Sequence, residues 1–171
     1  MERMVEIDLS EFKDFVSRLK RAASGDFKKE CTLFLHGLGT DFLGIVEDEI
    51  KRRKVMDTRL LLASFHEGGD GNVWELSNDG LTIEVGTNVE YAKWVNDGHW
   101  TNPKGVESRF VPGRWEGDRF IYEPSAKTGM VLKQKWVKGK PYFDSAKRIF
   151  EKIFPNTLEA KLQQWINEYF N

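Results

Sequence analysis

Few side chains in this sequence have the type and spacing that catalysis or metal binding requires. His66 and His99 are the two central histidines, and neither lies in an H-x-x-x-H or H-E-x-x-H pattern. Ser64 and His66 could be arranged as part of a catalytic triad, but no G-x-S-x-G turn surrounds the serine. Cys31 is the single cysteine and falls on an apolar helix stripe, which favours a buried thiol over a nucleophile. We therefore expect no catalytic residue, no metal site and no cofactor.

Three glycines resemble a nucleotide-binding loop only superficially. Gly37, Gly39 and Gly44 follow no strand, and Phe42 occupies the position of the third glycine of a dinucleotide fingerprint. Gly37 and Gly44 instead share one face of a predicted helix. We expect these two glycines to let another backbone pack closely against that helix.

The segment from His99 to Trp136 has the composition of a binding surface, because aromatic and basic side chains alternate along it. Such side chains stack on bases and bind phosphates, and they also anchor protein interfaces. Both interpretations remain open, although an acidic segment in the same chain favours self-association. The residues expected to make the contacts are Trp94, Trp100, Phe110, Arg114, Trp115, Arg119 and Trp136. The alternative for each tryptophan is a place in the core.

The charge of the chain is balanced overall but segregated along the sequence. Lys and Arg number 26, and Asp and Glu number 27. Residues 61–100 contain 1 basic and 7 acidic side chains, whereas residues 101–148 contain 11 basic and 5 acidic ones. Complementary charges align surfaces that meet, so these segments could bind each other in neighbouring subunits of an oligomer. They could equally neutralise each other within one molecule.

Hydrophobic periodicity predicts helices at both ends of the chain and strands in the middle. Apolar residues recur every three or four positions over residues 26–53, as in a long core helix. The other predicted helices cover residues 10–23, 60–65 and 91–95. Asp57 or Thr58 is expected to cap the second of these. Predicted strands are residues 5–9, the hairpin 73–77 and 81–87, and parts of 119–123 and 130–137.

The last predicted helix starts at Pro141 and has an apolar face. Pro155 either kinks this helix or starts a further one. The residues expected to face inward are Phe143, Ala146, Ile149, Phe150 and Ile153. Together the elements predict an α+β fold with long helices packed on a small antiparallel β-sheet. We expect a single domain of residues 1–171 with a long loop and strand insertion at about 99–140.

The cellular setting follows from what the sequence lacks. A single cysteine, no apolar leader and no apolar run of membrane length indicate a protein of a reducing cytoplasm that does not contact a membrane.

Three phrases of the sequence, in this order along the chain, resemble one family. Residues 55–60, V-M-D-T-R-L, are similar to V-D-T-G-x-L, and residues 85–99, V-G-T-N-V-E-Y-A-K-W-V-N-D-G-H, to V-G-T-N-V-x-Y-A-x-x-V-E-x-G-x. Residues 140–146, K-P-Y-F-D-S-A, resemble x-P-F-L-x-x-A. These stretches are typical of the tail-completion or head-to-tail joining proteins of long-tailed phages, especially those of PBSX-type defective prophages. Arg59 replaces the glycine of the first stretch, which predicts a more regular helix start.

The resemblance implies a non-enzymatic structural protein of the virion, made in the cytoplasm of the bacterial host. It would form a ring, expected to be a hexamer, at the neck between the head-side connector and the tail terminator or tube. DNA would pass through this ring. The alternative function is a DNA-contacting protein that uses the basic aromatic insertion, for which we expect strongly salt-dependent binding to duplex DNA.

Overall fold

The computed structural model describes residues 3–8, 26–55, 59–78 and 80–170. The predicted helix at 10–23 and the capping residues Asp57 and Thr58 lie outside the described residues. The chain forms two compact units. Unit 1 consists of Met1–Asn96 and Lys140–Asn171, and unit 2 consists of Asp97–Gly139. Unit 2 therefore covers almost the whole predicted insertion.

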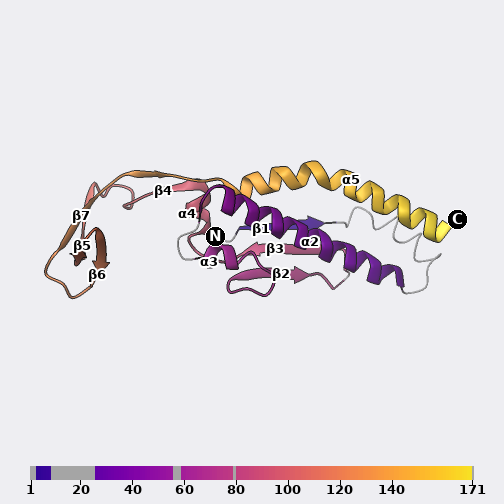
Figure 1. Ribbon diagram of the computed structural model, residues 1–171, viewed down its shortest axis with the longest axis horizontal. Coiled ribbons are helices and arrows are strands. Elements are labelled where there is room, and N and C mark those ends of the chain that lie inside the picture. The colour runs from indigo at the N-terminus through magenta and orange to yellow at the C-terminus, as the bar shows by residue number, and fades with distance from the viewer. Residues whose placement is uncertain (1–2, 9–25, 56–58, 79, 171) are drawn as a thin grey trace. The chain divides into compact units, whose positions relative to one another are not determined.

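Unit 1 contains a three-stranded antiparallel sheet and two long helices, which Figure 1 shows side by side. The sheet has the order β1-β3-β2 and consists of β1 (Arg3–Asp8), β2 (Asn72–Leu76) and β3 (Thr82–Thr87). The long helices are α2 (Asp26–Arg52) and α5 (Tyr142–Phe170). Two short helices, α3 (Leu60–Ala63) and α4 (Ala92–Asp97), lie between them in sequence. The predicted α+β class is confirmed.

The core of unit 1 lies between the apolar stripe of α2, the inner face of the sheet and one face of α5. Phe42, Val46 and Ile50 of α2 are fully buried, as their spacing in the sequence predicts. Phe42 packs edge-on against Phe143 and Phe150 of α5, with ring centroids 5.6 and 5.4 Å away. These aromatic contacts hold the two long helices together.

Helix α5 continues through Pro155, so no separate last helix forms. Phe143 and Phe150 are buried as predicted, but Ile149 and Ile153 are 39% and 43% exposed. The inward prediction for these two isoleucines is wrong. At 3.6 residues per turn they lie at the edge of the buried stripe, not at its centre.

Close packing against a glycine of α2 occurs at Gly39, and not at the predicted Gly37 and Gly44. Among the described residues, nothing would lie within 4 Å of a Cβ atom built on Gly37 or Gly44, so no described backbone packs closely against this pair as predicted. A Cβ on Gly39 would lie 2.8 Å from the Trp74 ring and 3.1 Å from Ile83. Gly39 is therefore the position at which the sheet approaches α2 closely.

Cys31 is buried on the apolar stripe of α2, as predicted. Burial raises the pKa of its thiol to about 11, and the neighbouring Glu30 adds to the rise. A thiol that stays protonated at neutral pH is a poor nucleophile. Cys31 is a core side chain.

Four consecutive basic residues, Lys51 to Lys54, stand at the C-terminal end of α2. Arg52 donates to Glu49 at 2.7 and 2.6 Å, and Arg53 donates to Glu49 at 3.0 Å. Lys54 has a φ of 54°, and the N–H of Val55 donates to the carbonyl of Ile50 at 3.0 Å. This is a Schellman cap, in which the left-handed position is usually glycine.

Arg59 also adopts the left-handed conformation, with a φ of 63°, just before α3. The side chain of Arg59 makes no capping hydrogen bond. The expectation of a more regular helix start is therefore wrong. The backbone still takes the conformation that favours the glycine of the family stretch, although an arginine stands there.

Unit 2 consists of two small antiparallel sheets. The first pairs β4 (Gly98–Trp100) with β8 (Trp136–Lys138). The second has the order β6-β5-β7, from β5 (Ser108–Glu116), β6 (Arg119–Tyr122) and β7 (Gly129–Lys133). Strands β6 and β7 fall where the sequence predicts them, whereas β4 and β5 were not predicted.

Strand β5 escapes prediction because Pro112 and Gly113 interrupt its pattern. These residues stand where β5 changes partner, pairing with β7 up to Pro112 and with β6 from Gly113 onward. A Cβ on Gly113 would collide with the backbone oxygen of Ile121 and would lie 2.7 Å from the Phe120 ring. Only glycine fits this crossing point.

The described residues contain no group of His, Cys, Asp and Glu side chains suited to a metal ion. Over the same residues, no helix has both the length and the apolar character that crossing a membrane requires.

Candidate interface

The two ends of unit 2 are fixed by hydrogen bonds within unit 1. The N–H of Lys140 donates to the carbonyl of Val95 at 2.8 Å, which joins the outgoing and the returning chain. The buried Asn96 accepts from the N–H of Phe143 at 2.9 Å and donates to Asp144 at 2.7 Å. Asn96 thereby caps the first turn of α5 from a distant position in the sequence.

A buried hydroxyl pair organises the neighbouring part of unit 1. Thr87 donates to Ser64 at 2.8 Å, and Ser64 donates to the carbonyl of Leu61 at 2.8 Å. Both hydroxyls are fully buried. The proton of Ser64 is thus committed to a backbone carbonyl, while His66 lies 3.6 Å from Glu47. Ser64 has a structural role in this network.

Unit 2 presents its aromatic residues as pairs on neighbouring strands. Trp100 stands opposite Trp136, with ring centroids 5.3 Å apart, and Trp115 stands opposite Phe120 at the same centroid distance. Phe110 stands opposite Val131. We call these three pairs, Trp100/Trp136, Trp115/Phe120 and Phe110/Val131, the aromatic pairs.

The aromatic pairs are exposed to solvent except for Phe120, which is half-buried. The exposed fraction is 56% for Trp100, 58% for Trp115, 56% for Phe110 and 64% for Val131. Within the described part of unit 2, no apolar side chain is buried, and the buried polar side chain is Asn102. Small sheets normally need an apolar face packed against another layer. Unit 2 exposes the side chains that would form this layer, which is typical of an interaction surface.

The predicted arginines differ in their surroundings. Arg114 donates to Glu116 at 3.1 Å and to Glu123 at 2.8 Å. The hydrogen bond with Glu116, followed by the charges of both glutamates, raises the pKa of Arg114. Its charge is therefore balanced within unit 2. Arg119 is exposed and stands opposite Glu116 in the register of β5 and β6.

The predicted contact residues divide between the two units. Trp100, Phe110, Arg114, Trp115, Arg119 and Trp136 all belong to unit 2, and Trp94 lies on α4 in unit 1, where it is 55% exposed. The structure brings Trp100 and Trp136 into contact. The core alternative is excluded for Trp94, Trp100, Trp115 and Trp136, since all four are exposed.

Sequence reasoning missed three exposed apolar residues of unit 2, Val131, Tyr122 and Val137. Val131 stands between Met130 and Leu132, which are less exposed, so three consecutive apolar residues hide the alternation of β7. The register with Phe110 is what identifies its face. Tyr122 ends β6, and the alternation of a four-residue strand is too short to assign it.

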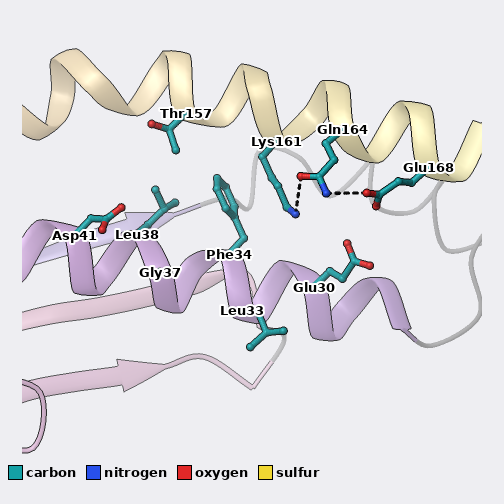
Figure 2. A pocket seen from close by; sticks show the side chains of 10 residues that line it. All are labelled: Glu30, Leu33, Phe34, Gly37, Leu38, Asp41, Thr157, Lys161, Gln164 and Glu168. Carbon is teal, nitrogen blue, oxygen red and sulfur yellow. Dashed lines mark hydrogen bonds between the residues drawn. The ribbon is translucent and has the colours of Figure 1, made fainter.

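A groove of about 450 Å³ runs between α2 and α5 in unit 1 (Figure 2). Its lining combines apolar side chains such as Phe34 with the charged Glu30 and Lys161. Trp165 closes against it, donating to Glu30 at 2.7 Å and packing edge-on against Phe34. The polar groups on α5 bond to one another, as Lys161 does to Gln164 at 3.1 Å. Among the described residues that line the groove, no nucleophilic side chain is paired with a general base.

Comparison with known proteins identifies the family. The family described as "Bacteriophage HK97-gp10, putative tail-component" matches residues 10–98, just over half of the chain. The Phage-like element PBSX protein XkdI of Bacillus subtilis (strain 168) is 46% identical over 156 residues, which cover 91% of this chain and 96% of the relative. The uncharacterized protein YqbI of the same strain is 47% identical over 159 residues, or 91% and 95% of the two chains.

No solved structure matches the chain. The relatives confirm the resemblance to a PBSX-type prophage protein, which rests on stretches in both halves of unit 1. The chain belongs to the HK97-gp10-like family of phage tail components and is a phage structural protein.

Proposed function

We propose that the protein is a tail-completion component that joins the head-side connector to the tail. The family supports a place in the tail, and the match to the PBSX relative over 91% of the chain supports a role shared by the whole protein. The observation that carries the proposal is that unit 2 leaves large apolar side chains exposed, among them Trp100, Phe110 and Trp115. A joining protein needs such surfaces for its partners.

The protein acts as a ring, expected to be a hexamer, with DNA passing through its centre. Its partners are other copies of the chain, the head-side connector and the tail terminator or tube protein. Ring assembly requires two different complementary surfaces on each subunit. The exposed aromatic pairs of unit 2 supply one of them.

The protein is not an enzyme in this proposal. Ser64 donates its proton to the carbonyl of Leu61, and burial raises the pKa of Cys31 to about 11. Neither side chain is prepared for nucleophilic attack.

The test is deletion of the gene from the prophage that encodes the chain, followed by induction and electron microscopy. We expect filled heads and tails of normal length that are not joined, and we expect the full-length chain supplied from a plasmid to restore joined particles. Joined particles in the deletion strain would contradict the proposal. Heads without any tails in the preparation would also contradict it, because they would indicate a role in building the tail itself.

The DNA-contacting alternative is tested with the purified full-length protein. Binding of duplex DNA that weakens steeply as salt rises would support this alternative. The pairing of Arg114 with Glu116 and Glu123 argues against it, since these glutamates cancel the charge that would meet a phosphate.

A further inference from the structure

We infer that two of the aromatic pairs of unit 2, Phe110/Val131 and Trp100/Trp136, dock on the outer face of the β1-β3-β2 sheet of a second copy of the chain. This inference rests on the proposed function, because it requires copies of the chain to meet in a ring. It identifies the two surfaces that meet where neighbouring copies of the chain contact each other in the ring.

The outer face of the sheet carries a row of three carboxylates. Glu84 of β3 stands directly opposite Glu6 of β1 and directly opposite Glu75 of β2. Ile83 and Val85, on either side of Glu84, are fully buried. Side chains alternate between the two faces of a strand, so Glu6, Glu75 and Glu84 share the face that points away from the core.

Within the described part of the chain, this row places like charges side by side. Like charges that stand directly opposite each other on neighbouring strands destabilise a sheet. None of the three glutamates forms an ion pair with the described residues. A partner that brings positive charge to this face would relieve the repulsion between them.

Unit 2 carries positive charge on the same faces as two of the aromatic pairs, Phe110/Val131 and Trp100/Trp136, whereas Trp115/Phe120 lies on the other face of β5 from Phe110. In β7, Lys133 lies two residues from Val131 and shares its face, and in β8 Lys138 lies two residues from Trp136. Both lysines are exposed. Each combines with an exposed apolar side chain, as in interfaces where apolar contacts give affinity and charges give orientation.

A second copy of the chain is the occupant that these observations favour. The acidic row repels the phosphates of DNA, so it does not suit a nucleic acid. One chain carries both the acidic sheet face and the lysine-bearing aromatic surface, and two different complementary patches on each subunit generate a head-to-tail ring. The same contact then repeats around the ring.

Charge exchange tests the inference in the prophage, with full-length variants and with joined particles counted by electron microscopy. Glu75→Lys with Glu84→Lys should reduce joined particles about tenfold or more, because like charges would then face Lys133 and Lys138. Lys133→Glu with Lys138→Glu should have a similar effect. The chain with all four changes should restore joining, since the opposite charges meet again.

The matched control is Asp70→Lys with Glu90→Lys, which makes the same change of net charge on exposed residues outside the three strands of the sheet. It should leave joining unchanged. Purified Glu84→Gln should unfold at a temperature no lower than the wild type, because it removes like-charge repulsion. This result separates loss of assembly from loss of folding.

If the chain with all four substitutions fails to restore joining, the inference is overturned, since another protein or DNA would then occupy one of the surfaces. Equal loss in the matched control would overturn it as well. Joined particles in the strain without the gene would instead overturn the proposed function, so the two failures are distinguishable.

Discussion

Asn96, at the end of α4, caps α5 by accepting a hydrogen bond from the N–H of Phe143 at 2.9 Å. The stretches that contain these two residues stand on either side of unit 2 in the sequence, and they meet inside unit 1. Unit 1 therefore closes its own fold where unit 2 begins and ends. The hydrogen bonds of Asn96 with Phe143 and Asp144 involve no residue of unit 2.

We expect Asn96→Ala to lower the free energy of unfolding by about 2 kcal/mol. The change leaves the N–H of Phe143 without its acceptor and removes the donor to Asp144, both in a buried setting. Urea denaturation followed by circular dichroism measures the loss. Asn88→Ala, an exposed change in the same stretch, is the control and should stay within about 0.5 kcal/mol of the wild type. Equal stability of both variants would show that Asn96 does not cap α5.

Glycine at the two left-handed positions should stabilise the protein. Lys54 and Arg59 have φ values of 54° and 63°, a conformation that costs a residue with a Cβ atom about 1 kcal/mol. Lys54→Gly and Arg59→Gly should each raise the unfolding free energy by about 0.5 kcal/mol, since the greater freedom of glycine in the unfolded chain offsets part of the gain. Thermal unfolding measures the change. Lys51→Gly, inside α2, should destabilise by about 1 kcal/mol, and a similar loss from Lys54→Gly would contradict the assignment.

Stability should fall in acid because of Glu49. Hydrogen bonds from Arg52, and further ones from Ser145 and Arg53, lower the pKa of this buried carboxyl from 4.5 to about 2. A lowered pKa stabilises the folded state above the unfolded value, so this contribution is complete above about pH 5 and is lost as the pH falls from 4.5 towards 2. Urea denaturation of the wild type and of Glu49→Gln should show a difference of about 1–2 kcal/mol near neutral pH. The unfolding free energies of the two proteins should become equal near pH 2. A difference that stays constant with pH would contradict the lowered pKa of Glu49.

The sequence identifies most of unit 1 because its elements are long and periodic. The stripe of α2 places Phe42 and Val46 in the core, and the alternation of residues 73–77 and 81–87 predicts the pairing of β2 with β3. The exceptions are positions whose burial depends on a residue far away in the sequence. Gly39 is buried because Trp74 lies against it, and the spacing of the glycines alone selected Gly37 and Gly44 instead.

In unit 2 the aromatic and basic composition of the sequence indicates the candidate interface, but the hydrophobic pattern does not predict all of its strands. Pro112 and Gly113 are strand breakers by type, yet they allow β5 to exchange one partner strand for another. The exposed state of Val131 follows from its pairing with Phe110, which no local pattern contains. The paired state of Arg114 likewise depends on Glu123, nine residues away on the other side of a turn. Long-range register decides these features.

The most direct test of the account is hydroxyl-radical footprinting of the tryptophans, read by mass spectrometry, in the free protein and in assembled particles. The account predicts that Trp100, Trp115 and Trp136 are oxidised readily in the free protein, because each is exposed, and are protected several-fold in particles. Trp165 is buried in the single chain and serves as the internal control, with slow oxidation in both states. Equal oxidation of the three unit 2 tryptophans in free protein and particles would contradict the claim that unit 2 is an interface.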